Sequence, residues 1–106
     1  MSLDVTLTDD GEFVYSRNIT HNLNVMADKV GLYEYLWRPE RFNIKGARLL
    51  IKPLTKGLRK LKANPEKYKK FNPENGWGDY EGLVRFVGDY LDACSYYPNA
   101  EVSVSR

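Results

Sequence analysis

Hydrophobic and polar residues alternate at the start of the chain. In LDVTLT, Leu3, Val5 and Leu7 are separated by polar neighbours, the two-residue period of a strand with one buried face. The DDG triplet at residues 9–11 is a hairpin-turn signal, and EFVYS at residues 12–16 follows it. The pattern therefore predicts an N-terminal β-hairpin.

A helical period begins near Thr20. One apolar stripe comprises Ile19, Leu23, Met26, Val30, Tyr33 and Trp37. These positions recur every three or four residues, which is typical of an amphipathic helix. We expect Gly31 to interrupt this helix and RPE at residues 38–40 to end it, because proline disfavours helical geometry in the residue before it.

A second amphipathic helix is predicted over residues 46–62. Its apolar arc comprises Ala47, Leu50, Ile51, Leu54, Leu58 and Leu61. These residues fall within about 100 degrees of the helix surface. Pro53 lies inside the span and lacks a backbone N–H, so a kink or a break is expected there.

The remaining pattern completes an α+β fold. NPE occurs at residues 64–66 and 72–74, and each copy predicts a short helical turn with Pro at its first position. A last helix is predicted over residues 79–95, followed by a strand at AEVSVS, residues 100–105. We expect a small single α+β domain over residues 1–106, with three main helices and a C-terminal strand joining the hairpin.

Length and composition limit the classes of protein. A chain of 106 residues and 12.3 kDa suits one domain, and one cysteine forms no internal disulfide. The N-terminal residues show no basic region followed by an apolar run, and nowhere do about 18 apolar residues follow one another. We therefore expect a cytoplasmic protein with no secretory signal and no membrane contact; the oligomeric state is not predicted.

Few residues are suited to catalysis. His21 is the only histidine, and with Asn24 and Asp28 it shares a polar helix face that would suit a general base oriented by an acid. The favoured alternative is a surface histidine with local hydrogen bonds. Cys94 could pair with His21 as a nucleophile, but its place on an apolar stripe favours an inert core thiol. We expect no enzyme, no cofactor and no metal site, because the ligands for a metal are too few.

Charge is distributed unevenly along the chain. Residues 45–70 contain ten lysines and arginines and one acid, a net charge of +9, whereas the whole chain carries +2, leaving −7 elsewhere. Arg48, Lys52, Arg59 and Lys62 align on the polar side of the second helix. This ridge could bind nucleic-acid phosphates or an acidic protein surface, or it could be a solvated face that attracts the acidic half of the same chain.

Trp77 lies between two glycines in FNPENGWGDYEG, residues 71–82. The glycines allow a sharp turn that aims the indole. The indole could cover the end of the core, which the apolar residues that follow favour, or it could form a ligand platform. In the nucleic-acid alternative, Tyr68, Phe71 and Trp77 would stack on bases.

Four motifs occur in order: NITHNLNVMA, LYEYLWRPE, FNPENGWGDYEGLVRFV and YPNAEVSVSR. Together they resemble a family of small uncharacterised proteins of bacteria, prophages and phages. The resemblance implies a compact phage-type accessory protein in the host cytoplasm. It assigns no catalytic or binding residues. Such proteins often bind a host defence or regulatory component, which is an analogy rather than evidence from a site.

The favoured function is a non-enzymatic interaction protein. It would bind a macromolecular partner, preferably a protein, through Arg48, Lys52, Arg59, Lys62, Tyr68 and Trp77. The first alternative is binding of a nucleotide or nucleic acid through residues 45–70. The second, less favoured, is a small enzyme that depends on His21.

Overall fold

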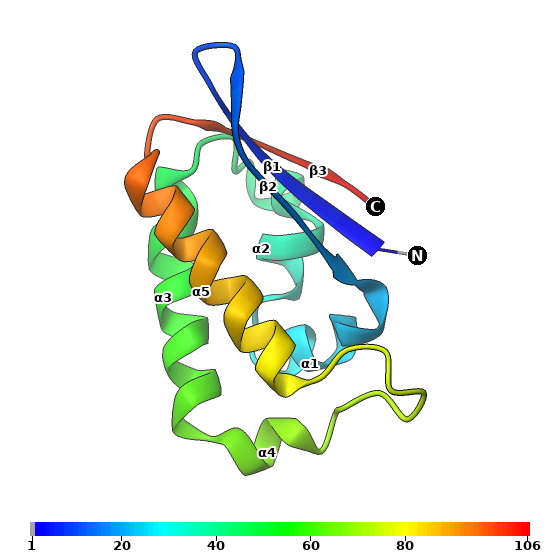
Figure 1. Ribbon diagram of the computed structural model, residues 1–106. Coiled ribbons are helices and arrows are strands. Elements are labelled where there is room, and N and C mark those ends of the chain that lie inside the picture. Colours follow the sequence, from blue (N-terminus) through cyan, green and yellow to red (C-terminus); the bar gives the residue numbers. More distant parts are fainter. Residues whose placement is uncertain (1) are drawn as a thin grey trace.

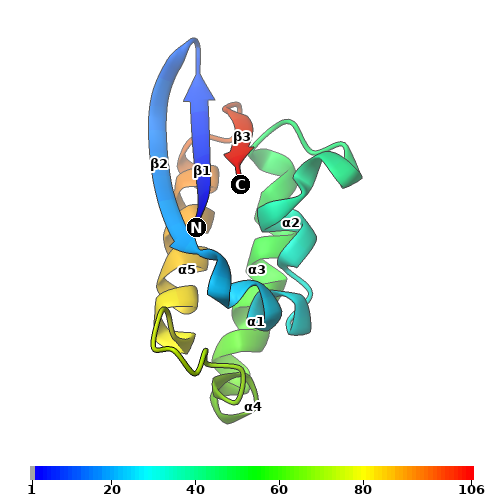
Figure 2. The same cartoon turned by 90° about the vertical axis from the view of Figure 1, so that its right-hand side faces the viewer.

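The structure, a computed structural model, describes residues 2–106 and has an α+β fold (Figures 1 and 2). Its strands are β1 (Ser2–Asp9), β2 (Glu12–Thr20) and β3 (Glu101–Ser105). Its helices are η1 (His21–Leu23), α1 (Asn24–Lys29), α2 (Tyr33–Trp37), η2 (Pro39–Phe42), α3 (Arg48–Ala63), α4 (Pro65–Lys69) and α5 (Tyr80–Tyr96). The helices lie on one side of the sheet.

The sheet is antiparallel, with the order β2-β1-β3. The predicted hairpin is confirmed, and its turn has positive φ at Asp10 and Gly11, as a two-residue hairpin turn requires. Leu3, Val5 and Leu7 of the central strand are fully buried against the helices. The alternation in the sequence thus marks the face of the sheet that the helices cover.

The C-terminal strand returns to the hairpin, as predicted. Val102 and Val104 of β3 pair with Leu7 and Val5 of β1 and add to the covered face. The segment between η2 and α3 is hydrogen-bonded to β3, because the Val102 amide donates to the Lys45 carbonyl at 2.8 Å. Both ends of the chain therefore meet in one sheet.

The predicted first helix is divided into three short pieces, η1, α1 and α2. Gly31 interrupts it, as expected, with φ of +84°. The Gly31 amide donates to the Asp28 carbonyl at 3.0 Å and the Leu32 amide to the Ala27 carbonyl at 2.8 Å, the paired bonds of a Schellman motif. The chain therefore reverses after α1, and Leu32 is directed into the core.

Helix α3 runs without a break through Pro53, so the expected break is absent. Proline leaves the carbonyl four residues earlier without its helical donor, and here that residue is Leu49. Leu49 is 53% exposed, so water can reach this part of the helix. A carbonyl left without its helical donor costs less on a solvent-facing side of a helix than in the core, which agrees with the continuation of α3 through Pro53.

The two NPE motifs behave differently. The first begins helix α4, as predicted, with Pro65 in its first turn. The second begins no helix, and the prediction there is wrong: the Gly76 amide donates to the Pro73 carbonyl at 3.2 Å in a simple turn. Asn72 instead accepts from the Tyr80 amide at 2.8 Å, so it satisfies a free donor at the start of α5.

Helix α5 matches its prediction closely and packs along α3. Asp79 caps it, because its carboxylate accepts from the Gly82 amide at 2.7 Å. The Tyr80 hydroxyl donates to the Leu61 carbonyl of α3 at 2.6 Å. This bond joins the start of α5 to the end of α3 and so helps to fix the position of α3 relative to α5.

Candidate functional site

The outer side of α3 carries a continuous row of basic side chains. We define the basic face as the exposed residues Arg48, Lys52, Lys56, Arg59, Lys60 and Lys62. The four ridge residues predicted from helical spacing all belong to it. The opposite side of α3 buries Leu50, Leu54 and Leu61 in the core. Burial of these leucines fixes the orientation of the helix and presents the cations to solvent.

The cations of this face have no ionic partners within residues 2–106. The ion pairs of the structure join Arg17 with Asp89, Lys69 with Glu66 and Glu81, and Arg106 with Glu40. On the basic face, Arg48 donates to the uncharged side-chain oxygen of Asn99 at 2.7 Å. The acidic residues of the chain therefore form no ion pairs with α3, and the basic face is exposed to solvent, which agrees with both a binding surface and a solvated helix face.

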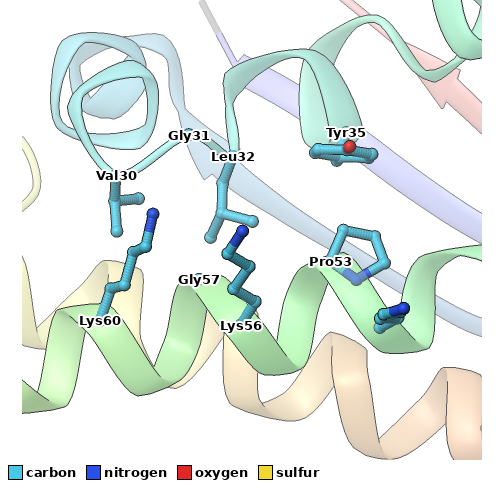
Figure 3. A pocket seen from close by; sticks show the side chains of 9 residues that line it. Val30, Gly31, Leu32, Tyr35, Pro53, Lys56, Gly57 and Lys60 are labelled. Atoms are coloured by element: carbon cyan, nitrogen blue, oxygen red, sulfur yellow. The ribbon is translucent and has the colours of Figure 1, made fainter.

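A groove of about 380 Å³ lies between α3 and the segment that joins α1 to α2 (Figure 3). It is lined by Val30, Gly31, Leu32, Tyr35, Lys52, Pro53, Lys56, Gly57 and Lys60. In Figure 3 the side chains of Lys56 and Lys60 rise from α3 toward Leu32 and Val30. The groove therefore combines an apolar wall with one edge of the basic face.

Sequence reasoning missed this groove. The spacing of Lys52, Lys56 and Lys60 places them on one edge of a helix, and that signal is readable in the sequence. The opposite wall comes from Leu32 and Tyr35, which the chain reversal at Gly31 brings over α3. No local pattern in the sequence shows which element will lie over α3.

Tyr68 is buried, with 3% of its surface exposed, so its predicted role in stacking or partner binding is wrong. Tyr68 lies in α4 with its side chain directed into the core. The ammonium group of Lys67 lies 5.5 Å from the centroid of the Tyr68 ring. Phe71 is half-buried, and Lys29 lies 5.7 Å from its ring centroid. Stacking of successive bases along Tyr68, Phe71 and Trp77 is therefore not supported.

Trp77 is 70% exposed, so the prediction that it covers the core is wrong. The neighbouring Gly78 makes the close contact instead: a Cβ there would lie 2.7 Å from Thr20 Cγ2 and 3.0 Å from Leu23 Cγ. The backbone at Gly78 thus closes against η1 and leaves the indole outside. Trp77 lines an open hollow together with Ser2, Asn18, Thr20 and Asn22, none of which belongs to α3.

The three polar candidates do not form one site. Asn24 and Asp28 line a shallow depression with Val25, Lys29 and Tyr33. His21 is not part of that lining; it lies edge-on to Trp37, with ring centroids 6.2 Å apart. Its Nε2 atom is buried and has no hydrogen-bond partner in the part of the chain that the structure describes. An acid–base pair of His21 with Asp28 is therefore not assembled.

Cys94 is fully buried on α5, as its position on the apolar stripe predicted. Burial raises the pKa of its thiol from 9.0 to about 12. The reactive form of cysteine is the thiolate, which such a pKa makes scarce at neutral pH. The arrangement is that of an inert thiol.

We expect Cys94 to react with a thiol reagent at pH 8 at least about 100-fold more slowly in the native protein than in denaturant, because both access and thiolate formation are suppressed. The release of the coloured reagent anion, followed over time, measures both rates. Because the pKa is raised, native reactivity should increase as pH rises toward 12 while the fold persists. Rapid labelling at pH 8 would restore Cys94 as a candidate nucleophile.

No helix in residues 2–106 has both the length and the apolar character needed to cross a membrane. Over the same residues, no cluster of three or more His, Cys, Asp or Glu side chains is placed to hold a metal ion. Comparison with protein-family models, curated proteins and solved structures finds no match.

Proposed function

We propose that this chain is a non-enzymatic interaction protein that binds an acidic surface of a protein partner through the basic face of α3. The observation that supports the proposal is that the cations of this face are exposed on one helix and lack carboxylate partners in the described chain. Complementary charge accelerates association and selects partners.

The basic face is also preorganised. Helix α3 is anchored to the core by buried leucines and to α5 by the Tyr80–Leu61 hydrogen bond. Its backbone therefore needs little reordering on binding, which lowers the entropic cost of association. The motif resemblance adds the class of partner: a host defence or regulatory component in the cytoplasm of a host cell.

The test is capture from a host lysate treated with nuclease. The variant Arg48→Glu/Lys52→Glu/Arg59→Glu/Lys62→Glu should lose the partner, because it reverses the charge of four of the six cations of the face. Exposed charges contribute at most about 1 kcal/mol each, so thermal unfolding should change little.

A matched control reverses four exposed cations outside α3, namely Lys29, Arg41, Lys70 and Arg85. It changes the net charge of the chain by the same amount, and it should retain most of the partner. Equal loss in both variants would indicate a general charge effect. Full retention in the α3 variant, or loss of all capture after nuclease treatment, would contradict the proposal.

A further inference from the structure

The groove between α3 and the α1–α2 segment has features of a small-ligand site that binding of an acidic protein surface does not require. Its volume of about 380 Å³ is within the range of about 300–1,000 Å³ that is usual for small-molecule sites. Its floor is rigid, because Leu32 packs directly on Gly57, where even a Cβ would lie 2.4 Å from Leu32 Cγ. The floor of the groove is therefore formed by residues that are packed at the edge of the hydrophobic core.

One end of the groove is suited to a planar ring. Tyr35 and Pro53 both line it, and Figure 3 shows the Tyr35 ring over the Pro53 ring. Phe42, which is itself 48% exposed, lies against the Tyr35 ring, with ring centroids 4.9 Å apart. Contact with Phe42 orients the tyrosine ring in advance, so stacking a ligand on it costs little side-chain entropy.

The other part of the groove is suited to an anion. Lys52, Lys56 and Lys60 follow one another at four-residue spacing, and none of them pairs with a carboxylate in residues 2–106. Like charges at this spacing repel one another, and an anion between them would relieve that repulsion. Asp28 and Glu34 line the neighbouring depression beyond Gly31 and do not line this groove.

We propose that the groove binds a mononucleotide, with the base against Tyr35 and Pro53 and the phosphate held by Lys56 and Lys60. Lysine ammonium groups are common phosphate ligands, and base–aromatic stacking is tolerant of base identity. A single nucleotide is favoured over a strand because the groove offers one aromatic ring, and Tyr68 is buried. The proposal does not depend on the protein-binding function of the basic face.

Calorimetric titration with AMP, GMP, CMP and UMP tests the proposal, with inorganic phosphate and the matching nucleoside as the two halves of each ligand. At least one mononucleotide should bind more tightly than either half, and higher salt should weaken binding. Lys56→Ala/Lys60→Ala should lower affinity by at least about 10-fold, because two charge-assisted contacts are lost. Tyr35→Ala should lower it by about 10-fold through loss of one base stack.

The control Arg59→Ala/Lys62→Ala removes two cations from the same helix outside the groove lining, and it should bind within about two-fold of the parent chain. Amide NMR signals of Gly31 and Gly57 should shift on titration, which reports binding at the groove without any variant. The proposal is overturned if no mononucleotide binds at millimolar concentration, if phosphate alone binds as tightly, or if groove and control variants respond equally. Binding of a single-stranded oligonucleotide alone would also overturn it, in favour of strand binding.

Discussion

Gly78→Ala is expected to lower the free energy of unfolding by about 2–6 kcal/mol. Two costs combine in this estimate. Gly78 has φ of +93°, where a residue with a side chain is strained by about 1–3 kcal/mol. The new methyl group would also lie 2.7 Å from Thr20 Cγ2 and 3.0 Å from Leu23 Cγ, and overpacking of this kind costs about 1–3 kcal/mol. Denaturant unfolding followed by circular dichroism measures the change.

Two neighbours serve as controls. Gly76 also has positive φ, +76°, but a Cβ there meets no atom within 4 Å, so Gly76→Ala should cost about 1–2 kcal/mol from strain alone. Trp77→Ala should cost less than about 1 kcal/mol, because the side chain is largely exposed. If Trp77→Ala proved more damaging than Gly78→Ala, the indole rather than the glycine backbone would hold the loop against η1.

Gly57→Ala is expected to destabilise the protein by about 2 kcal/mol even though alanine is the better helix former. Replacement of glycine by alanine in a helix usually contributes up to about 1 kcal/mol of stability. Here the added Cβ would lie 2.4–2.5 Å from three carbon atoms of Leu32, which is 1% exposed and has little space to move. Overpacking, at about 1–3 kcal/mol or more, therefore exceeds the gain in helix propensity.

Gly88 in α5 provides the opposite case. A Cβ added at Gly88 would lie 3.9 Å from its nearest neighbour, Leu58 Cδ2, which is an ordinary van der Waals contact. Gly88→Ala should therefore stabilise the protein by about 0.5–1 kcal/mol. Thermal and denaturant unfolding of both variants measure the two signs. Stabilisation by Gly57→Ala would show that Leu32 does not pack on α3 as closely as the structure indicates, and that the groove floor is open.

Local pattern was sufficient for most of the fold. Alternation at Leu3, Val5 and Leu7 indicated the covered strand face, and the apolar stripes of α3 and α5 indicated which sides of these helices are buried. Both patterns work because hydrophobic burial acts on every second residue of a strand and on one stripe of a helix. Helical spacing also predicted that the cations of α3 lie on the side opposite the apolar stripe, and these cations are exposed.

The pattern of apolar and polar residues did not predict side-chain exposure where that exposure depended on contacts with residues remote in sequence. Whether Trp77 is turned inward depended on the fit of Gly78 against Thr20, a contact between a loop and the end of a strand. Whether Tyr68 is exposed depended on the path of the chain after α3, since an aromatic near basic residues suits either a surface or a core edge.

The sequence by itself determined the α+β class, the N-terminal hairpin, a C-terminal strand and a cationic helix facing solvent, because each follows from the period of apolar residues, from a local turn signal or from charge count. Tertiary structure alone decided that the cations of α3 lack carboxylate partners within residues 2–106 and that three lysines border a groove under Tyr35. The groove arises where the chain reversal at Gly31 brings Leu32 onto Gly57. Packing between separate segments sets such contacts, and helical or strand periodicity carries no information about them.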